Sequence, residues 1–415
     1  MNTILGELGK SPKFCEYVKC IENKKSPIVI SGLTDVGMVQ ILAATKEFVK
    51  KPICIITYNE IQARKIVEDL NYFTDKIIYL PKKEIVTYDY VAESKDLPYE
   101  RIDALNKIQD LKTGIVVTTI EAVNQKMISS KDLYKNILNF KIGEEYKLED
   151  IKQKLVELGY VRCDLIEGRG QFSVRGGIVD ISINDKIGIR IEFWGDEIDS
   201  IRNFNIVSQR SIENLEKVII YPAHEYLVTT NIEEVINKIQ NIVYAEEIQE
   251  QVKQDIEIIK SGNYISKIDR YLNSFYEKQE TILDYLSEKF IVALDEINKI
   301  NQRLENVNLD NQNVIKLLIE KGKIVPEALK NISTCREFEE KLENRQKIYL
   351  EKFDDEIKIQ AEKYKWVYKE KNFYKSEIEI LFKEILKAQE AKKKIYILAE
   401  TKEKAKKICT LLDEQ

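Results

Sequence analysis

The sequence contains a single histidine, His224, and this scarcity excludes most chemistry that depends on imidazole. Zinc sites draw on histidine and cysteine ligands, and a Ser-His-Asp triad would rest on that one residue. The 6 cysteines are scattered and form no C-x-x-C pair, which is typical of free thiols in a reducing compartment. The sequence therefore predicts no metal site.

Long hydrophobic runs and an excess of positive charge are also missing. No segment approaches the roughly 20 apolar residues of a membrane span, and the N-terminus lacks the layout of a signal peptide, so we expect a cytoplasmic protein with no membrane partner. With 65 Lys and Arg against 70 Asp and Glu, the net charge is -5. Nucleic-acid-binding domains are usually basic, so this composition disfavours strong DNA binding but leaves room for a local basic stripe.

The length of 415 residues predicts two to four domains, at roughly 100–200 residues each. The first part of the chain alternates apolar strands with amphipathic helices, an order that is typical of a parallel sheet covered by helices on both faces. Strands are expected at 27–31, 53–57, 77–80 and 115–119, with helices from about Phe14, after Gly37, after the N-cap Asn59, and at 96–111.

From about residue 147 the pattern changes to one helix, 148–158, followed by short strands with alternating apolar and polar residues. Gly176-Gly177 fits a two-residue hairpin turn because both glycines can take positive φ, and Gly195-Asp196 fits a second turn. These residues predict a small antiparallel α+β domain inserted into the α/β fold. Further along, helices are expected at 230–285, 337–365 and 401–412, and strands at 290–294 and 395–398.

The loop after the first strand has the context of a phosphate-binding loop, G-x-x-x-x-G-K-[ST]. Gly32 and Gly37 stand at the right spacing, but Met38 and Val39 occupy the lysine and hydroxyl positions. Met38 brings no charge to a phosphate, where a charge-assisted hydrogen bond contributes roughly 1.5–3 kcal/mol, and Val39 cannot coordinate Mg²⁺. Asp35 adds a negative charge, so we expect no hydrolysis and weak or absent nucleotide binding. An ordinary strand-to-helix turn is the alternative interpretation.

A second degenerate motif is expected at Asp295-Glu296, where the strand at 290–294 ends. In P-loop enzymes a strand-end aspartate holds Mg²⁺, and a neighbouring acid orients water. Buried strands that end in acids are common, so this pair indicates a relic only beside the degenerate phosphate loop. We therefore predict an α/β fold with a degenerate RecA- or P-loop-like parallel sheet flanked by helices. The first part of this P-loop-like domain is expected at 1–126 and the inserted domain at 127–226. A helical region and the remainder of the P-loop-like domain are expected at 227–415.

Several blocks of the sequence resemble the inserted domain that UvrB shares with the bacterial transcription-repair coupling factors. They are EGRGQFSVRGGIVDI at 167–181, IEFWGDEIDSIR at 191–202, SQRS at 208–211, YPAHE at 221–225 and, further upstream, LPYER at 97–101. The resemblance covers nearly the whole chain and is weakest between 230 and 285.

Met38 and Val39 favour the coupling factors, because UvrB has an intact phosphate loop. The few residues between Tyr90 and Leu97 also leave no room for the DNA-probing hairpin of UvrB.

The resemblance implies a function in transcription-coupled nucleotide excision repair. A coupling factor removes RNA polymerase stalled at a lesion and recruits UvrA through its inserted domain. Its motor, which uses ATP and Mg and translocates on double-stranded DNA, lies further along its chain. We therefore expect this chain to be a fragment of a longer protein, non-catalytic by itself and without a cofactor of its own.

The resemblance also implies which residues bind UvrA. Arginines of the inserted domain make the contact in this family, and the matching positions are Arg162 and Arg175, with Arg169 and Phe172 as neighbours. Ser173 stands where UvrB has another arginine, which puts that contact in doubt. Strand alternation independently places Arg175 on a polar face, and arginine suits paired hydrogen bonds to carboxylates. A solvated face with incidental arginines is the alternative. Alternation also predicts an exposed Trp194, either a second contact or a residue packed on a neighbouring domain.

Two other functions stay open from the sequence. A UvrB-like ATP-dependent DNA helicase-type enzyme would need a lysine and a threonine at positions 38 and 39, and hydrolysis by this chain would favour it. A DNA-binding scaffold of the same fold is disfavoured by the net charge of -5. Salt-dependent binding of plain duplex DNA would favour the scaffold.

Overall fold

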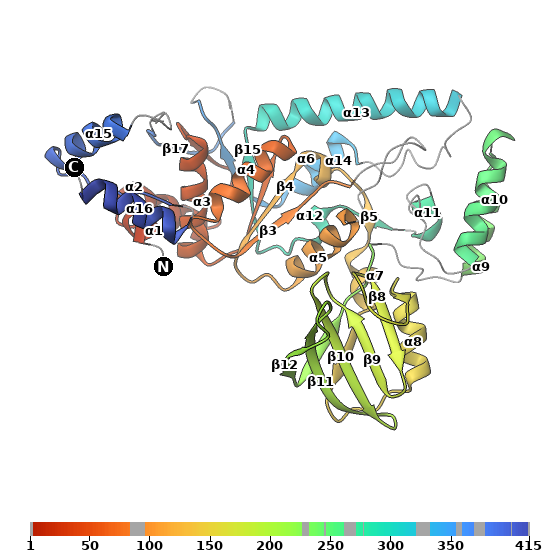
Figure 1. Cartoon of the computed structure of the whole chain (residues 1–415). Coiled ribbons are helices and arrows are strands. Elements are labelled where there is room, and N and C mark those ends of the chain that lie inside the picture. The colour runs from red at the N-terminus through yellow and green to blue at the C-terminus, as the bar shows by residue number, and fades with distance from the viewer. Residues whose placement is uncertain are drawn as a thin grey trace.

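Two sheets dominate the chain, a seven-stranded sheet in the upper part of Figure 1 and a six-stranded sheet below it. The computed structural model describes residues 3–83, 96–225, 232–244, 246–260, 271–276, 278–320, 333–353, 359–368, 378–399 and 401–413. The predicted α/β class is confirmed, and so is the separate small sheet of the inserted segment.

The neighbouring strands of the seven-stranded sheet run parallel, in the order β17-β1-β16-β15-β2-β4-β3. The strands are β1 Ile28–Ser31, β2 Ile53–Thr57, β3 Ile77–Leu80, β4 Ile115–Thr119, β15 Ile291–Asp295, β16 Gln346–Leu350 and β17 Glu362–Lys365. The strands predicted in the first part of the chain all form, and so does the one expected at 290–294.

Helices cover both faces of this sheet because its strands are apolar on both sides. In β2, Ile53 and Ile55 pack in one hydrophobic cluster, whereas Cys54 and Ile56 pack in the other. The first cluster receives α1 Thr3–Leu8, α2 Pro12–Glu22, α3 Asp35–Val49 and α4 Glu60–Leu70. The second receives α5 Leu97–Gln109, α6 Ile120–Val123, α7 Ser130–Lys135, α9 Ile232–Gln240, α10 Glu246–Lys260, α11 Leu272–Phe275, α12 Ile282–Tyr285, α13 Ile297–Glu320 and α14 Cys335–Glu343. Asn59 caps α4 as predicted.

The inserted segment forms the six-stranded sheet, in the order β12-β11-β10-β9-β8-β7. The strands are β7 Val161–Arg162, β8 Gln171–Arg175, β9 Ile178–Ser182, β10 Ile187–Trp194, β11 Glu197–Asn205 and β12 Ser211–Leu215. Helix α8, Leu148–Glu157, packs on the inner face. The sheet is mixed rather than fully antiparallel, because β7 pairs with β8 in parallel. Two short pairs stand apart, β6 Leu138–Lys141 with β13 Lys217–Ile220, and β5 Met127–Ile128 with β14 Gln279–Glu280.

Both predicted hairpin turns of the inserted domain form, at Gly176-Gly177 and at Gly195-Asp196. Gly176 has a φ of 60°, in the left-handed region that favours glycine. The positive φ expected at Gly177 is wrong, since this residue is not among those in that region. A Cβ at Gly177 would instead lie 2.8 Å from the carbonyl oxygen of Phe193. Close backbone approach is therefore what requires the second glycine.

Two expectations about the last third of the chain are wrong. Where it is described, the stretch 337–365 forms most of α14 followed by β16 and β17, rather than a continued helix. Strand β17 lies at the edge of the sheet, where charged side chains can face solvent, and this explains its charged composition. The segment 395–398 forms no strand, and none of the described strands pairs with it. Its side chains are 38% to 43% exposed, so it lacks both the burial and the backbone partners of a sheet strand.

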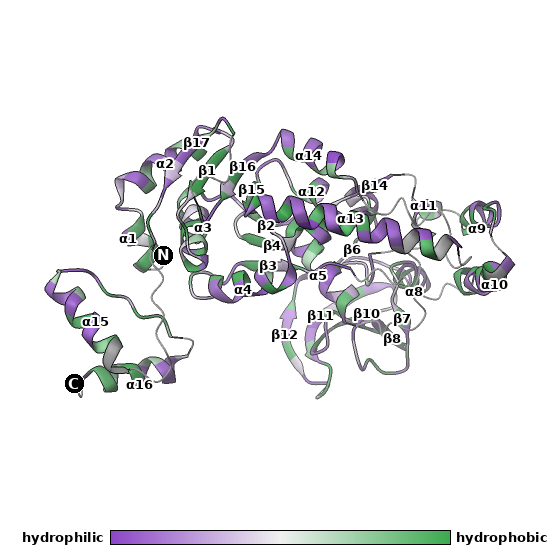
Figure 2. Ribbon diagram, turned by 90° about the horizontal axis from the view of Figure 1, so that it is seen from above, coloured by the Kyte–Doolittle hydropathy of each residue, from purple (hydrophilic) through white to green (hydrophobic). Residues whose placement is uncertain are grey.

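Two helices follow the last strand, α15 Ile378–Glu390 and α16 Lys402–Asp413, and the second confirms the helix expected at 401–412. Seen from above, both lie to one side of the rest of the chain (Figure 2). The helical character of 230–285 is confirmed, where that region is described, by α9, α10, α11 and α12, but Gln279–Glu280 forms the short strand β14. No helix in the described ranges is both long and apolar enough to span a membrane. The interval between Tyr90 and Leu97 falls mostly outside the described residues.

Candidate functional site

The loop predicted to be a degenerate phosphate loop connects β1 to α3. Thr34 caps the helix by accepting a hydrogen bond from the backbone N–H of Gly37 at 3.1 Å, so that α3 begins at Asp35, inside the loop. Met38 and Val39 are 3% and 0% exposed and pack in the hydrophobic cluster on this side of the sheet. The positions that would carry a lysine and a hydroxyl in an ATPase therefore contribute to the core.

Contacts with a distant part of the chain require both glycines of this loop. Gly32 has a φ of +76°, and a Cβ there would lie 1.9 Å from the carbonyl oxygen of Trp366. A Cβ at Gly37 would lie 2.7 Å from the ring of Tyr368. The backbone N–H of Tyr368 also donates to the carbonyl oxygen of Gly32 at 3.3 Å. The chain itself thus accounts for the glycines, without reference to a phosphate.

The negative charge of this loop is balanced by two lysines. Nζ of Lys65 lies 2.6 Å from Oδ2 of Asp35, and Nζ of Lys352 lies 2.8 Å from Oδ1. Burial raises the pKa of Asp35, but the two lysines outweigh burial and lower the pKa to about 2. Asp35 is therefore ionised near neutral pH, and an approaching phosphate would meet a carboxylate.

The acids at the end of β15 are held by neighbouring groups of the chain. Asp295 is 2% exposed, and its Oδ2 accepts a hydrogen bond from the Thr57 hydroxyl at 2.7 Å. Burial raises the pKa of Asp295 to about 6. Glu296 accepts the backbone N–H of Lys352 at 2.9 Å and pairs with Nζ of Lys299 at 2.5 Å. Lys352 therefore contacts both predicted degenerate motifs, which the fold brings together at the carboxyl-terminal ends of β1 and β15.

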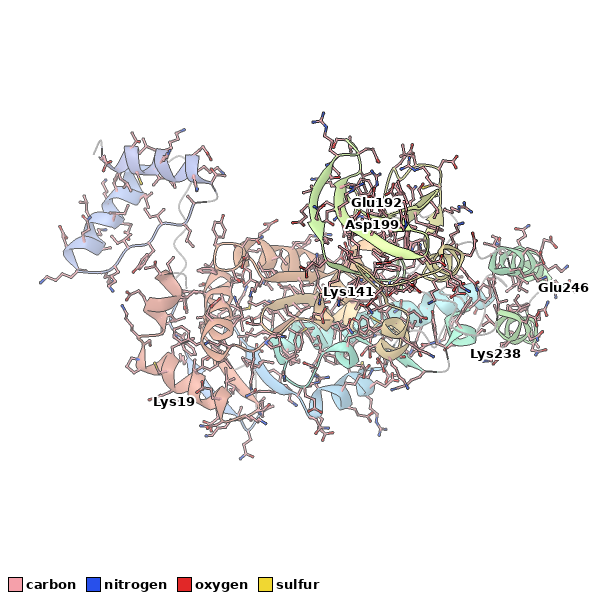
Figure 3. The ribbon with its side chains drawn as sticks, turned by 90° about the horizontal axis from the view of Figure 1, so that it is seen from below. Lys19, Lys141, Glu192, Asp199, Lys238 and Glu246 are labelled. Atoms are coloured by element: carbon pink, nitrogen blue, oxygen red, sulfur yellow. The ribbon has the colours of Figure 1, made fainter. Side chains whose placement is uncertain are left out.

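The outer face of the six-stranded sheet, opposite α8, carries several arginines. The side chain of Arg175 is 49% exposed, and its Nη2 donates to Oδ2 of Asp180 at 2.8 Å. Asp180 is 2% exposed and also accepts hydrogen bonds from Arg190, from Nε at 2.6 Å and from Nη2 at 2.8 Å. Glu192 of the same sheet, which Figure 3 labels, forms an ion pair with Arg202. Arg175 is thus the half-exposed end of a polar network on this face.

The other residues predicted to bind a partner lie in different surroundings. Arg162 is exposed in β7, in register with Phe172 of β8. Phe172 is fully buried in the core of the inserted domain, so its side chain is not available to a partner. Nε of Arg169 donates to Asp185 at 2.8 Å, and its Nη1 lies 3.7 Å from Asp103 of α5. Arg169 therefore connects the inserted domain to the α/β part.

Three of the sequence blocks that carry the resemblance meet at a joint between the two parts. Arg101 of α5 donates to Glu225 from Nε at 2.5 Å and from Nη2 at 3.2 Å. Tyr99 packs against His224 with ring centroids 5.3 Å apart, and a Cβ at Gly170 would lie 2.5 Å from the Tyr99 hydroxyl. Sequence patterns give no sign of this joint, because no local spacing signals a pair 124 residues apart.

Trp194 is exposed as predicted, with 85% of its surface accessible at the turn between β10 and β11. The neighbouring N–H of Phe193 donates to the carbonyl oxygen of Gly177 at 2.8 Å. The turn of Trp194 therefore lies beside the turn that follows Arg175. Exposed tryptophan and arginine are both enriched in protein interfaces.

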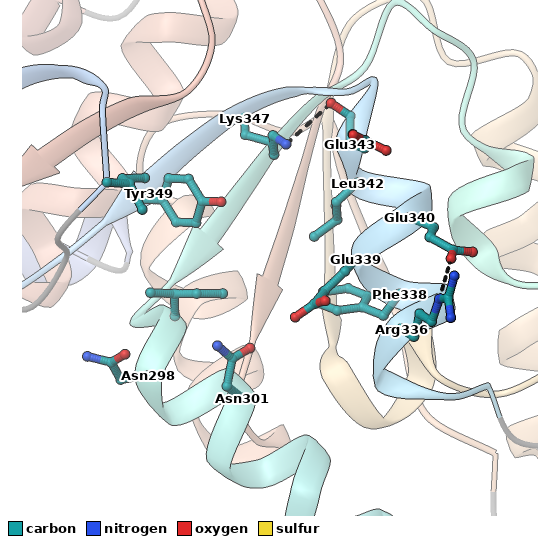
Figure 4. Close-up of a pocket in the computed structure, with 12 residues that line it drawn as sticks. Asn298, Asn301, Arg336, Phe338, Glu339, Glu340, Leu342, Glu343, Lys347 and Tyr349 are labelled. Carbon is teal, nitrogen blue, oxygen red and sulfur yellow. Dashed lines mark hydrogen bonds and ion pairs between the residues drawn. The ribbon is translucent and has the colours of Figure 1, made fainter.

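A groove of about 670 Å³ opens between α13, α14 and β16 (Figure 4). Asn298, Asn301 and Phe338 are among the residues that line it. At its rim Nε of Arg336 donates to Glu340 at 2.7 Å. The lining mixes amides, acids and apolar groups without a recognisable catalytic set, and we assign no function to it.

The fold defines a class: an α/β protein with a seven-stranded parallel sheet and a separate small domain built on a mixed sheet. Residues 138–226 match the family model of the UvrB interaction domain. The expected domain boundaries after 126 and 226 stay predictions.

The relatives that match 71% to 78% of this chain are transcription-repair-coupling factors. The chain is 27% identical to the transcription-repair-coupling factor of Bacillus subtilis (strain 168) over 341 residues. This aligned stretch covers 78% of this chain and 29% of the relative. It is 30% identical to the transcription-repair-coupling factor of Staphylococcus aureus (strain bovine RF122 / ET3-1) over 308 residues. This aligned stretch covers 71% of this chain and 26% of the relative. The chain thus spans less than a third of the length of these relatives. The resemblance to the transcription-repair coupling factors is confirmed.

Proposed function

We propose that this chain is the UvrB-like module of a transcription-repair coupling factor and that its inserted domain recruits UvrA in transcription-coupled nucleotide excision repair. The match of residues 138–226 to the UvrB interaction domain supports this proposal, as does the similarity to coupling factors. The observation that carries the site is the half-exposed guanidinium of Arg175 on the outer face of this domain. Exposed Arg162 of β7 is the second proposed contact.

Arginine suits this function for physical reasons. Its guanidinium is planar and presents several N–H donors in a fixed fork that matches a carboxylate. Arg175 uses Nη2 in its hydrogen bond to Asp180, so other donors of the fork can reach a partner. The exposed Trp194 adds apolar area near the same turn, which is the composition of a small binding hot spot.

We further propose that the α/β part is non-catalytic and binds no cofactor. The burial of Met38 and Val39 supports this, because neither can contact a phosphate or a metal. The ion pairs of Asp35 with two lysines support it as well. In the whole protein, ATP and Mg would serve a separate motor, and RNA polymerase and double-stranded DNA would be the other partners. These roles are part of the same proposal, since the chain spans 29% or less of its relatives.

Calorimetric titration of the chain with purified UvrA tests the docking proposal. We expect the wild-type chain to bind, and Arg175→Ala to weaken binding by about 2 kcal/mol or more, a roughly 30-fold rise in Kd. Arg336→Ala is the matched control, because Arg336 is an 87% exposed arginine of α14, outside the inserted domain. This control should bind like the wild type. Absence of binding by a correctly folded wild-type chain would overturn the proposal.

An ATPase assay separates this function from that of a UvrB-like ATP-dependent DNA helicase-type enzyme. We expect no ATP turnover, with or without DNA. Turnover that disappears in Asp295→Asn would favour the enzyme, because Asp295 stands at the position of a magnesium-binding aspartate. Salt-dependent binding of plain duplex DNA would favour a DNA-binding scaffold instead.

A further inference from the structure

Asp180 in β9 is a buried carboxylate on the outer face of the six-stranded sheet, with 2% of its surface exposed. Strand pairing places it between Ser173 of β8 and Arg190 of β10. Its two oxygens accept three hydrogen bonds from two guanidinium groups, two from Arg190 at 2.6 and 2.8 Å and one from Arg175 at 2.8 Å. Both oxygens of this acid are thus hydrogen-bonded to guanidinium groups.

The two arginines held by Asp180 differ in their remaining surroundings. The side chain of Arg190 is 15% exposed, and its Nη2 also donates to Gln209 at 3.1 Å. Its guanidinium carbon lies 4.5 Å from the ring centroid of Phe204, over the ring. Arg175 is 49% exposed. The same carboxylate therefore binds one mostly buried guanidinium, that of Arg190, and one half-exposed guanidinium, that of Arg175.

The charges of this group do not cancel. Asp180 carries one negative charge against the two guanidinium groups that it holds, and the adjacent Glu192 is already paired with Arg202. A net positive charge is therefore left at the most exposed member, Arg175. A carboxylate is the ligand that this arrangement fits, because it matches the planar fork in both charge and shape.

We propose that Asp180 is a positioning residue, which fixes the guanidinium of Arg175 in one orientation for capture of a carboxylate on the partner. The inference rests on the proposed docking function and adds the chemistry of the partner's contact residue, an Asp or Glu. A free arginine loses side-chain freedom when it is immobilised at an interface. An arginine that is already held by a buried acid has lost part of that freedom before the partner arrives.

A double-mutant cycle tests this inference, with Kd for UvrA measured for the wild type, Arg175→Ala, Asp180→Asn and the double variant. Asparagine keeps the size of the side chain but removes the charge that holds Arg175. We expect Asp180→Asn to weaken binding by roughly twofold to tenfold, the range that corresponds to ordering one flexible side chain. In the Arg175→Ala background the same change should have almost no effect, because Asp180 acts through Arg175.

Several outcomes would overturn the inference. Equal weakening in both backgrounds would indicate a general structural role for Asp180. Tighter binding by Asp180→Asn would mean that its charge opposes the partner. Glu121→Gln is the matched control, since Glu121 is an acid with 11% of its side chain exposed that holds Lys82 and Arg303 in the α/β part, and it should leave Kd unchanged. A wild-type chain that does not bind refutes the docking function and this inference together. Binding that depends on Arg175 but not on Asp180 refutes this inference alone.

Nuclear magnetic resonance of the guanidinium groups gives a second test, which does not depend on the folding of Asp180→Asn. In the free wild-type chain, rotation about the Nε–Cζ bond of Arg175 should be slow enough to give separate signals for its two Nη atoms. Arg336, which is 87% exposed, should give one averaged signal. An averaged signal for Arg175 as well would overturn its fixed orientation.

Discussion

Replacing Glu225 by alanine would leave the guanidinium of Arg101 buried without its counter-charge. The two residues are 3% and 1% exposed, and Arg101 donates to both carboxylate oxygens, at 2.5 and 3.2 Å. Its remaining Nη1 donates to the carbonyl oxygen of Pro81. Removing one partner of a buried ion pair costs roughly 3–5 kcal/mol. Since a folded protein is stable by only about 5–15 kcal/mol, Glu225→Ala should lose a large share of that stability.

Denaturant unfolding measures this loss, followed by circular dichroism and by the fluorescence of Trp194 and Trp366, one in each part of the chain. The control is the double variant Arg101→Met/Glu225→Leu, which should recover most of the stability because an apolar pair of similar size needs no counter-charge. A loss below about 1 kcal/mol for Glu225→Ala would refute the reasoning, since an exposed ion pair contributes no more than that.

The same pair predicts a dependence on pH. Burial raises the pKa of Glu225, but the charge of Arg101 outweighs burial, and the net pKa lies below the usual 4.5. The stability from the pair is therefore present above pH 4.5 and is lost as the pH falls through the lowered pKa of the folded state. The apolar double variant should lack this part of the acid sensitivity.

Two further predictions concern the α/β part. Burial raises the pKa of Asp295 from its usual 3.8 to about 6, so ionisation destabilises the fold as the pH rises through this range. Asp295→Asn should then be more stable than the wild type near neutral pH, by about 1–3 kcal/mol, and a variant with the same unfolding free energy as the wild type at neutral pH would contradict this. Gly32→Ala forces a Cβ to 1.9 Å from the Trp366 carbonyl oxygen and should lower the melting temperature clearly more than Gly143→Ala. Gly143 shares the positive φ, at +83°, but has open space around it. Equal shifts for the two variants would show that backbone conformation alone matters.

Local sequence patterns predicted the elements that depend on neighbouring residues. Apolar runs indicated the central strands, and period-two alternation placed Trp194 in solvent, where it is 85% exposed. In a strand with period-two alternation, Phe172 and Arg175 lie on opposite faces, and the core position of Phe172 agrees with that pattern rather than with the expected contact to a partner. Strand β17, with the sequence Glu362-Lys363-Tyr364-Lys365, has the composition of an exposed helix, because an edge strand tolerates charge on both faces.

The candidate site could be predicted only in part, because much of it depends on distant contacts. The sequence showed that Met38 and Val39 stand at the lysine and hydroxyl positions of the phosphate-loop pattern. It could not show that Trp366 and Tyr368 lie against the loop glycines, since these contacts join opposite ends of the chain. It also gave no sign that Asp180 is buried, because charged side chains are mostly exposed and are buried only where they are paired.

The position of β1 in the seven-stranded sheet has a consequence for how the chain folds during synthesis. Both neighbours of β1, the strands β16 and β17, come from residues 346–365. At roughly 5–20 residues per second, β1 waits on the order of 15–60 s for its first hydrogen-bonding partner. Each strand of the six-stranded sheet pairs with the strand next to it in the sequence. The six-stranded sheet of the inserted domain is therefore expected to form first, while the seven-stranded sheet is still open at β1.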